Sequence, residues 1–391
     1  MDIVLSAPHL AGPGGVQTYL LTVAPHLERL GHEVILWAPE QGETAARAVE
    51  IGLRVAETQQ DLPARCDAVL AHDGATALDL AAQYPDAVRA IVVHGADFDL
   101  HLPAQLPGAV NAAVVMNVTA EKRMRATSTP FELVRLRQPI DTARFRPAGP
   151  ISARPRRVLL LGNYLSGPRR DALVAACLEA GLECSAVGRY GQHRMDPRPD
   201  IARADIVVGQ GRSLLEAMAC GRAAWSFGPS GGDGWVTAAS YPAMEADGFR
   251  GRSNGKPAGD FAAALRQYTT DMGTVNRELV VEHHSAFDHA NELMSLLARL
   301  GRVPPPGRVV ALELARLKRS EYAAVGQTLE VARELREARS HARSLEDRVD
   351  DLEARLALEH ARLEEVISSR RWRTAKLLAS PLDRLRRAVR R

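Results

Sequence analysis

The stretch from Ile206 to Trp235 constrains the fold of this chain more than any other part of the sequence. It contains a short apolar strand (206–208), a glycine-containing loop, a helix (214–219) and a second apolar strand (223–227). Elements in this order predict one βαβ unit of a parallel sheet, with Ser213 as the expected N-cap of the helix. The start of such a helix faces the crevice at the carboxyl ends of the strands, where phosphates bind.

Glu216 is the candidate binding residue of this unit. It lies within the first turn of the predicted helix, so its carboxylate can reach a group docked there, such as a ribose. After the second strand, the glycine-rich run 231–234 is expected to form a turn. The alternative is an ordinary helix cap in a βαβ core that binds nothing.

Length and composition favour an α/β protein of more than one domain. The chain has 391 residues, 46% of them hydrophobic, and 30 glycines, which allows two domains and an appendage. The cysteines lack metal-type spacing and are expected to be reduced thiols, so we expect no metal site and a cytoplasmic location. We find no secretory signal and no apolar run near the roughly 20 residues that span a bilayer.

The N-terminal part has a Rossmann-like opening: a strand (2–7), a glycine loop and a helix (16–30). Its glycines do not form GxGxxG, so a bound dinucleotide is not expected. His72 and His94 each follow an apolar strand, at the edge of a parallel sheet where sites form. Either histidine could instead be a half-buried side chain bonded to a loop carbonyl.

Further strands are expected at 113–118, 157–161 and 184–187, with a helix at 171–180. Further along the chain, apolar residues recur at alternating spacings of three and four, which predicts a coiled coil. Glu359 interrupts this apolar pattern. A coiled coil indicates a homo-oligomer, most simply a parallel dimer, although a single surface helix would show the same stripe. The recurring positions are Leu314, Leu317, Ala324, Val331, Leu335, Ala338, Ala342, Leu345, Val349, Leu352, Leu356, Leu363 and Val366.

The last segment, Arg370–Arg391, is basic and amphipathic. Its nine basic residues and one acidic residue, Asp383, give it a net charge of +8. Since the whole chain has a net charge of +3, residues 1–369 carry −5. Interleaved Trp372 and leucines favour binding to an anionic membrane surface. Nucleic-acid binding by a basic arm is the alternative, but no nucleic-acid-binding fold accompanies this arm, so we expect no nucleic-acid partner.

The motif LLEAMACGRAAWSF (214–227) resembles the donor-binding motif of GT-B glycosyltransferases of family 4. The resemblance implies that Glu216 binds the nucleotide ribose and that Gly211, Arg212 and Ser213 lie beside the diphosphate. That family usually carries a second glutamate eight residues earlier, which contacts the donor sugar. Val208 occupies that position here.

Weaker resemblances concern the rest of the cleft. Residues 137–147 resemble the segment that crosses between the two GT-B domains. His94 matches a histidine that lines the catalytic cleft, and His72 and Asp97 are assigned to the acceptor side. The implied donor-side residues are Gly14, Gly15, Asn163 (where the family has arginine), Arg169 and Arg170 (which could replace a lysine) and Gly188.

The predicted fold class is therefore α/β, with two Rossmann-like domains of the GT-B type facing a cleft, followed by a long helical coiled coil. The domains are expected at 1–147 (acceptor side) and 148–300 (donor side), then a linker at 301–308, a coiled coil at 309–369 and the basic tail at 370–391.

The resemblance implies transfer of a sugar from a nucleotide-sugar donor to a glycan or lipid-linked acceptor in bacterial cell-surface polysaccharide synthesis. It also implies retained anomeric configuration, no metal and no cofactor. The protein would be peripheral on the inner face of the cell membrane. The alternatives are a non-catalytic scaffold that binds a glycan or nucleotide-sugar, which Val208 and Asn163 motivate, and a nucleotide-sugar epimerase.

Overall fold

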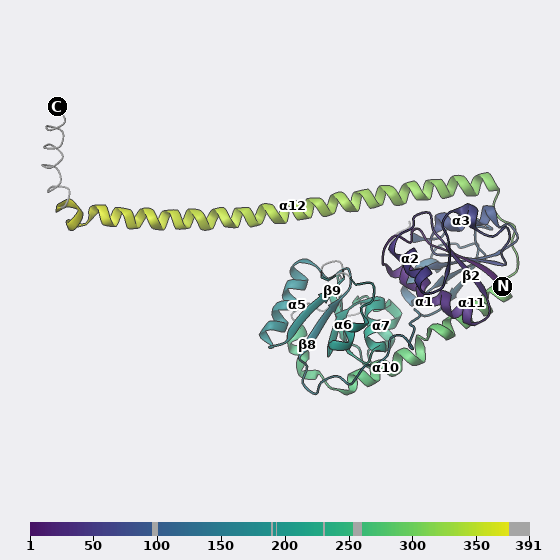
Figure 1. Cartoon of the computed structure of the whole chain (residues 1–391), viewed down its shortest axis with the longest axis horizontal. Coiled ribbons are helices and arrows are strands. Elements are labelled where there is room, and N and C mark those ends of the chain that lie inside the picture. The colour runs from purple at the N-terminus through teal and green to yellow at the C-terminus, as the bar shows by residue number, and fades with distance from the viewer. Residues whose placement is uncertain (96–100, 189–190, 193, 230, 253–259, 375–391) are drawn as a thin grey trace, which may run out of the picture. The chain divides into compact units, whose positions relative to one another are not determined.

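The computed structural model describes residues 1–95, 101–188, 191–192, 194–229, 231–252 and 260–374. The chain forms two compact units, Met1–Ser320 and Glu321–Arg391. The first unit contains two mainly parallel sheets, each flanked by helices (Figure 1). The predicted fold class, with two Rossmann-like domains, is confirmed.

The first sheet has the strand order β3-β2-β1-β4-β5-β6-β7, and every pair is parallel. Its inner strands are buried and mostly apolar because helices cover both faces of a parallel sheet. The strand order reverses between β1 and β4, which places a ligand crevice at their carboxyl ends. The elements are β1 (Asp2–Ser6), α1 (Gly15–Arg29), β2 (Glu33–Trp37), α2 (Glu43–Glu50), β3 (Arg54–Ala56), β4 (Ala68–Ala71), α3 (Gly74–Gln83), β5 (Val88–Val93), β6 (Ala112–Val115), α4 (Val118–Arg125) and β7 (Glu132–Arg135).

The second sheet has the order β12-β11-β10-β8-β9, parallel except for the pair β11–β12. Its order reverses between β8 and β10, a second switch point. The elements are β8 (Arg157–Leu161), α5 (Gly167–Glu179), β9 (Glu183–Val187), α6 (Arg198–Arg203), β10 (Ile206–Gly209), α7 (Gly211–Ala219), β11 (Ala223–Gly228), β12 (Gly231–Trp235), α8 (Tyr241–Asp247), α9 (Asp260–Ala264), α10 (Asp271–His283) and α11 (Ala286–Arg299).

Three local predictions were wrong. Helix α7 begins at Gly211, so Ser213 is its third residue and Gln210 is the N-cap. The glycine run 231–234 belongs to an edge strand, β12, because its backbone pairs with β11. The strand expected to reach residue 118 ends at Val115, because the Asn117 side chain accepts the Ala120 N–H and starts α4.

Helix α11 returns to the first sheet. Its Leu293, Leu296 and Leu297 are buried in the same core as Leu20 of α1 and Leu70 of β4. The chain therefore crosses back to the first domain at its last helix before α12. The core of the first domain therefore contains chain from both ends of the first unit.

Residues 301–303 are also bound to the first domain. The buried Arg89 guanidinium donates to five backbone carbonyl oxygens, among them Val303 O at 2.5 Å. Asn111 Nδ2 donates to Gly301 O at 2.6 Å. Burial lowers the pKa of Arg89, and the carbonyl dipoles replace the water that the cation has lost.

Helix α12 (Arg308–Ser368) begins by packing on α3. Ala311 and Ala315 are fully buried against Leu78, and the Arg319 guanidinium forms an ion pair with the buried Asp79 carboxylate. Leu314 packs at the edge of this cluster. The first turns of the predicted coiled coil are therefore occupied by contacts inside the first unit.

From Glu321 onward α12 is exposed along almost its whole length, as one continuous helix (Figure 1). Residues 375–391, which hold most of the predicted membrane-binding tail, lie outside the described residues. Within the part of the chain that the structure describes, no helix combines the length and apolar character needed to cross a membrane.

Replacing Arg319 by Ala should loosen α3. The Asp79 side chain is 6% exposed and would lose its cationic partner, which costs about 1–3 kcal/mol when the other partner is partly solvated. Hydrogen exchange of the α3 amides should accelerate by roughly 5- to 100-fold. Arg316→Ala is the matched control, because Arg316 pairs with an exposed glutamate, Glu313. Equal exchange in both variants would contradict the proposed anchoring.

Candidate functional site

The loops after β8 and β9 and the start of α7 meet at the switch point of the second sheet. A Cβ on Gly188, after β9, would lie 2.5 Å from Gly162 O, and one on Gly162, after β8, would lie 3.8 Å from Ser213 Oγ. Gly188 has φ +124°, which also favours glycine. The structure thus brings Asn163, Gly188 and Ser213 together at one sheet edge.

The start of α7 forms the floor of this edge. Gly211 has φ +56°, and its N–H donates to Phe249 O at 2.9 Å. By helix geometry the next amides of the first turn have no carbonyl partner inside the helix, and the helix dipole favours a negative charge there. This arrangement suits a phosphate group.

Arg169 and Arg170 lie in the first turn of α5, after β8. Arg169 is exposed and Arg170 is half-buried. The Nε of Arg170 is buried, and no described residue accepts its hydrogen bond. Cations at a helix N-terminus oppose the helix dipole, so an anion near them would be favoured.

Arg212 and Glu216 form a buried ion pair one turn apart on α7. Arg212 Nε donates to Glu216 Oε1 at 2.8 Å, and only 11% and 8% of the two side chains are exposed. The guanidinium also donates to Thr22 Oγ1 of α1 at 2.7 Å and to Pro139 O at 2.8 Å. Burial raises the pKa of Glu216, and the Arg212 charge opposes that rise. Arg212 therefore joins α7 to the first domain.

Val208 has no access to this site. It lies inside β10, fully buried in the core with Trp225 and Phe227. The usual first glutamate of family 4 therefore has no counterpart at this position, and the neighbouring Gly209 is closely packed, with Leu161 O 2.7 Å from where its Cβ would be.

On the first-domain side, His72 and His94 form a hydrogen-bonded pair. His72 Nδ1 lies 2.7 Å from His94 Nε2, and the ring of Tyr19 packs on both, with centroids 4.9 and 5.1 Å away. His72 is buried and His94 half-buried. The Nε2 of His72 is buried and has no partner among the described residues. Asp97 lies outside the described residues.

A third histidine, His289 of α11, completes this cluster. Its Nδ1 lies 2.9 Å from Arg137 O, so Nδ1 carries the proton and Nε2 accepts the Tyr19 hydroxyl at 2.7 Å. Burial and the nearby Arg212 charge lower the pKa of His94 to about 3. Burial lowers the pKa of His289 to about 4, and burial and the neighbouring His94 lower that of His72. All three rings are neutral near pH 7.

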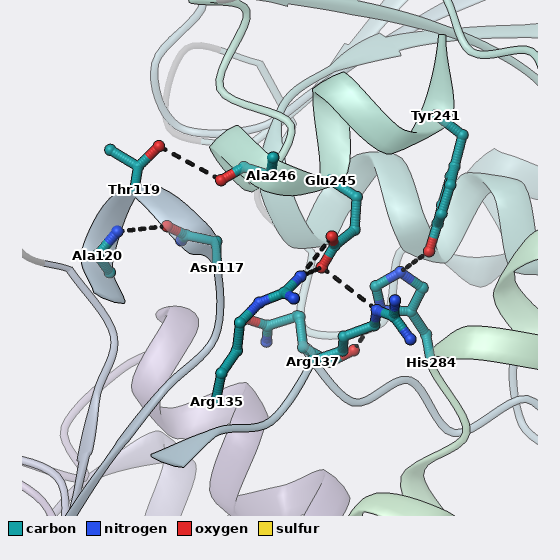
Figure 2. A network of polar contacts seen from close by, with 10 residues as sticks. Asn117, Thr119, Ala120, Arg135, Arg137, Tyr241, Glu245, Ala246 and His284 are labelled. Carbon is teal, nitrogen blue, oxygen red and sulfur yellow. Dashed lines mark hydrogen bonds and ion pairs between the residues drawn. The ribbon is translucent and has the colours of Figure 1, made fainter. Parts of the chain in front are cut away.

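A separate polar network holds the two domains where the chain crosses between them (Figure 2). Arg135 Nη2 lies 2.5 Å from both carboxylate oxygens of Glu245 on α8, and Arg137 Nε lies 3.5 Å from Glu245 Oε1. His284 Nδ1 donates to Gln138 O at 2.8 Å, so its Nε2 accepts the Tyr241 hydroxyl at 2.8 Å. The neutral His284 side chain therefore ties the segment around Gln138, where the chain first crosses between the domains, to the segment at His284, where it crosses back.

Gly14 and Gly15 lie at the start of α1, with Gly14 as its N-cap. A Cβ on Gly15 would meet nothing within 4 Å, so the backbone there is open to approach. The same helix carries Tyr19 and Thr22, which contact the histidine cluster and Arg212. The glycine pair and α7 are therefore linked through α1.

Sequence reasoning missed Tyr19, His289 and the pair of Arg135 with Glu245. Tyr19 lies buried on the apolar face of α1, like an ordinary core residue, but its hydroxyl has a specific partner 270 positions away. No local pattern marks such a contact. Of these residues, only His289 could have been found from the local sequence, because it is a histidine on the apolar face of a helix.

No protein-family model matches this chain, and no curated protein matches it. Solved structures do: a crystal structure of Anabaena HepE in complex with UDP and glucose matches with a TM-score of 0.54 and 13% identity. The match covers 76% of this chain and 99% of HepE. A structure of HepE with UDP-glucose matches with a TM-score of 0.52 and 12% identity over 76% of this chain and all of that one. The chain therefore has the GT-B fold.

Acid should destabilise the protein through the histidine cluster. The folded-state pKa of His289 is about 4, below the roughly 6.5 of an unfolded histidine. At acidic pH the unfolded state therefore binds more protons than the folded state does. Stability should be constant above about pH 6.5 and fall as the pH drops toward 4. Melting temperatures across this range should show a shallower fall for His289→Gln. The control His341→Gln, on exposed α12, should keep the full fall, and an unchanged slope in His289→Gln would contradict the role of the cluster.

Proposed function

We propose that this protein is a glycosyltransferase that moves a sugar from a nucleotide-sugar donor to a glycan or lipid-linked acceptor. One observation carries the proposal: in a GT-B fold, the loops after β8 and β9 and the start of α7 meet beside a buried carboxylate, Glu216. Phosphate-binding backbone and a ribose-binding carboxylate one turn apart are the two groups that a nucleotide-sugar requires.

In this proposal the donor diphosphate binds at Gly211–Ser213, next to Asn163 and the cations Arg169 and Arg170. Glu216 Oε1 is held by Arg212 Nε, and among the described residues no hydrogen bond takes Oε2, which is free to accept one from a ribose hydroxyl. The ion pair fixes the orientation of the carboxylate before the donor arrives. Gly188 lets the base approach the backbone closely.

The reaction breaks the bond between the anomeric carbon and a diphosphate oxygen and forms one between that carbon and the acceptor hydroxyl oxygen. The acceptor proton passes to the departing diphosphate. Arg169, Arg170 and the α7 start would stabilise the developing negative charge without a metal, and His94, held by His72, would contact the sugar as it becomes cationic. The neutrality of His94 suits this role. Departure and attack on the same face would retain the anomeric configuration.

The C-terminal segments support a proposal for where the protein acts and how its copies associate. The basic residues of 370–391 would hold the protein at an anionic inner membrane surface, where lipid-linked acceptors for cell-surface polysaccharides are found. The apolar stripe of α12 would join copies of the chain. His72 and Asp97 remain proposed acceptor-side residues.

The second candidate is a non-catalytic scaffold that binds a nucleotide-sugar or glycan. The burial of Val208 in place of a sugar-reading carboxylate favours it. Both readings predict donor binding, and only the first predicts turnover. Product analysis without acceptor would reveal the third possibility, an epimerase.

Glu216→Gln should weaken donor binding by about tenfold or more, since about 1.4 kcal/mol of carboxylate–ribose hydrogen bonding would be lost. Titration calorimetry on the full chain with UDP-glucose, then with GDP-, ADP- and dTDP-sugars, measures this. Glu245→Gln is the matched control: Glu245 is equally buried and ion-paired, 8% exposed like Glu216, but lies outside the proposed site. Equal loss in both variants, or no binding by the parent protein, would contradict the donor site.

His94→Ala should lower kcat by about 10²-fold or more while donor affinity changes little, because His94 is proposed to act on the sugar in the transition state. Turnover is measured by release of the nucleoside diphosphate with a panel of glycan and lipid-linked acceptors. His32→Ala, a half-buried histidine outside the site, is the control. Donor binding without turnover in the parent protein would favour the scaffold.

A further inference from the structure

Beyond the first unit, α12 carries an apolar stripe that nothing in the described chain covers. Val331, Leu335, Leu345 and Leu352 are between 48% and 63% exposed. A row of large apolar side chains at alternating spacings of three and four is the seam of a coiled coil. We propose that a second copy of this chain covers it in the antiparallel direction, with Val331 facing the partner's Leu356.

The proposal fixes which layers meet. Going along one helix, the seam residues from position 324 to 345 face those of the partner from 363 back to 342. Each layer then joins an a position to a d position, as antiparallel helices require. The resulting layers are Ala324 with the partner's Leu363, Thr328 with the partner's Glu359, Val331 with the partner's Leu356, Leu335 with the partner's Leu352, Ala338 with the partner's Val349, and Ala342 with the partner's Leu345.

In this register every alanine of the seam faces a large residue. Ala338 meets the partner's Val349, and Ala342 meets the partner's Leu345. A parallel dimer in register would instead stack Ala338 on itself and Ala342 on itself, in two consecutive layers. Facing small and large side chains fill a core evenly, whereas small–small layers leave voids. The sizes therefore favour the antiparallel arrangement.

Two glutamates occupy seam positions, Glu321 at its end and Glu359 within it, and Glu359 favours the antiparallel arrangement more strongly than the side-chain sizes do. Glu359 occupies a seam position, where its carboxylate pairs with Arg362 of the same helix at 2.6 Å. A parallel dimer would place two Glu359 carboxylates against each other in the interface, and like charges there are destabilising. In the antiparallel register each Glu359 faces the partner's Thr328 instead of a second carboxylate. The Thr328 hydroxyl donates to Ala324 O of its own helix at 2.8 Å, and a side-chain rotation would redirect this one proton to the facing carboxylate.

Flanking charges are compatible with the same register. Glu334 lies next to the partner's Arg355, and Arg339 lies next to the partner's Glu346. The two-fold symmetry of the dimer makes each of these pairs occur twice. A parallel dimer would form as many such pairs, Glu334 with the partner's Arg339 and Arg348 with the partner's Glu353, so the flanking charges alone do not set the direction.

The length of the seam fits as well. The same register places Val366 opposite the partner's Glu321, and Glu321 is the residue where the second unit begins. Earlier residues of α12 are already engaged, since Ala311 and Ala315 are buried on the first domain. The antiparallel seam therefore spans the part of α12 that remains available. This inference does not depend on sugar transfer.

Disulfide cross-linking of the full chain tests the direction. Leu335→Cys and Leu352→Cys are made separately, then mixed through mild unfolding and refolding of the coil and oxidised. Antiparallel pairing predicts that the mixed disulfide between the two variants is the main cross-linked species, while dimers that re-form from one variant stay uncross-linked. Each variant alone should cross-link little, because copies of one residue lie roughly 26 Å apart, 17 residues at about 1.5 Å each.

The matched control is Ser340→Cys mixed with Ala354→Cys, which places the thiols on the opposite face of the helix and should give little cross-linking. Efficient disulfide formation by Leu335→Cys alone and by Leu352→Cys alone would establish a parallel dimer and overturn the proposal. Light scattering of the unmodified full chain is the second measurement. A monomer at micromolar concentration would overturn it too, and a dimer together with the mixed disulfide would support it.

Discussion

The buried guanidinium of Arg212 is the constraint on which the central part of the structure depends. A cation with 11% of its side chain exposed needs partners in every direction. It finds a carboxylate on its own helix, a hydroxyl on α1 and a backbone carbonyl in the crossing segment. Its charge also helps to keep His94 and His289 neutral. One side chain thereby fixes the Glu216 carboxylate, the contact between two domains and the protonation of the proposed cleft.

The crossing segments are the second constraint. Ile140 pairs with Ser285 as a short parallel bridge, with Ile140 N donating to His284 O at 2.7 Å. His284 and His289 each donate from Nδ1 to the other crossing segment and accept a tyrosine hydroxyl at Nε2. Because both rings must be neutral to accept, the crossing segments and the histidine cluster share one dependence on pH.

The sequence predicts the parallel sheets and a helix that carries Glu216, because apolar runs and glycine loops are local patterns. It places Glu216 in the first turn of that helix, which is wrong, because α7 begins at Gly211 and Glu216 lies in its second turn. It does not predict β12, whose residues Gly231–Trp235 have no alternation and are fixed by pairing with an existing strand. It also misses the docked start of α12, because Ala311 and Ala315 give a weak apolar pattern and Leu314 and Leu317 continue the heptads. Contacts such as Tyr19 with His289 need the tertiary fold, and no spacing rule encodes them.

The return of the chain to the first domain bears on how this protein is made. The first core contains Leu293 and Leu297. The last of the carbonyl oxygens that accept a hydrogen bond from Arg89 belongs to Val303. A ribosome adding about 5–20 residues per second needs roughly 10–30 s to advance from residue 135 to residue 303. During that interval the first domain has all its strands but lacks α11, so apolar surface stays uncovered while the second domain is synthesised. Chaperones should therefore bind the nascent chain during this interval. The speed of translation through residues 136–303 should also affect the yield of folded protein.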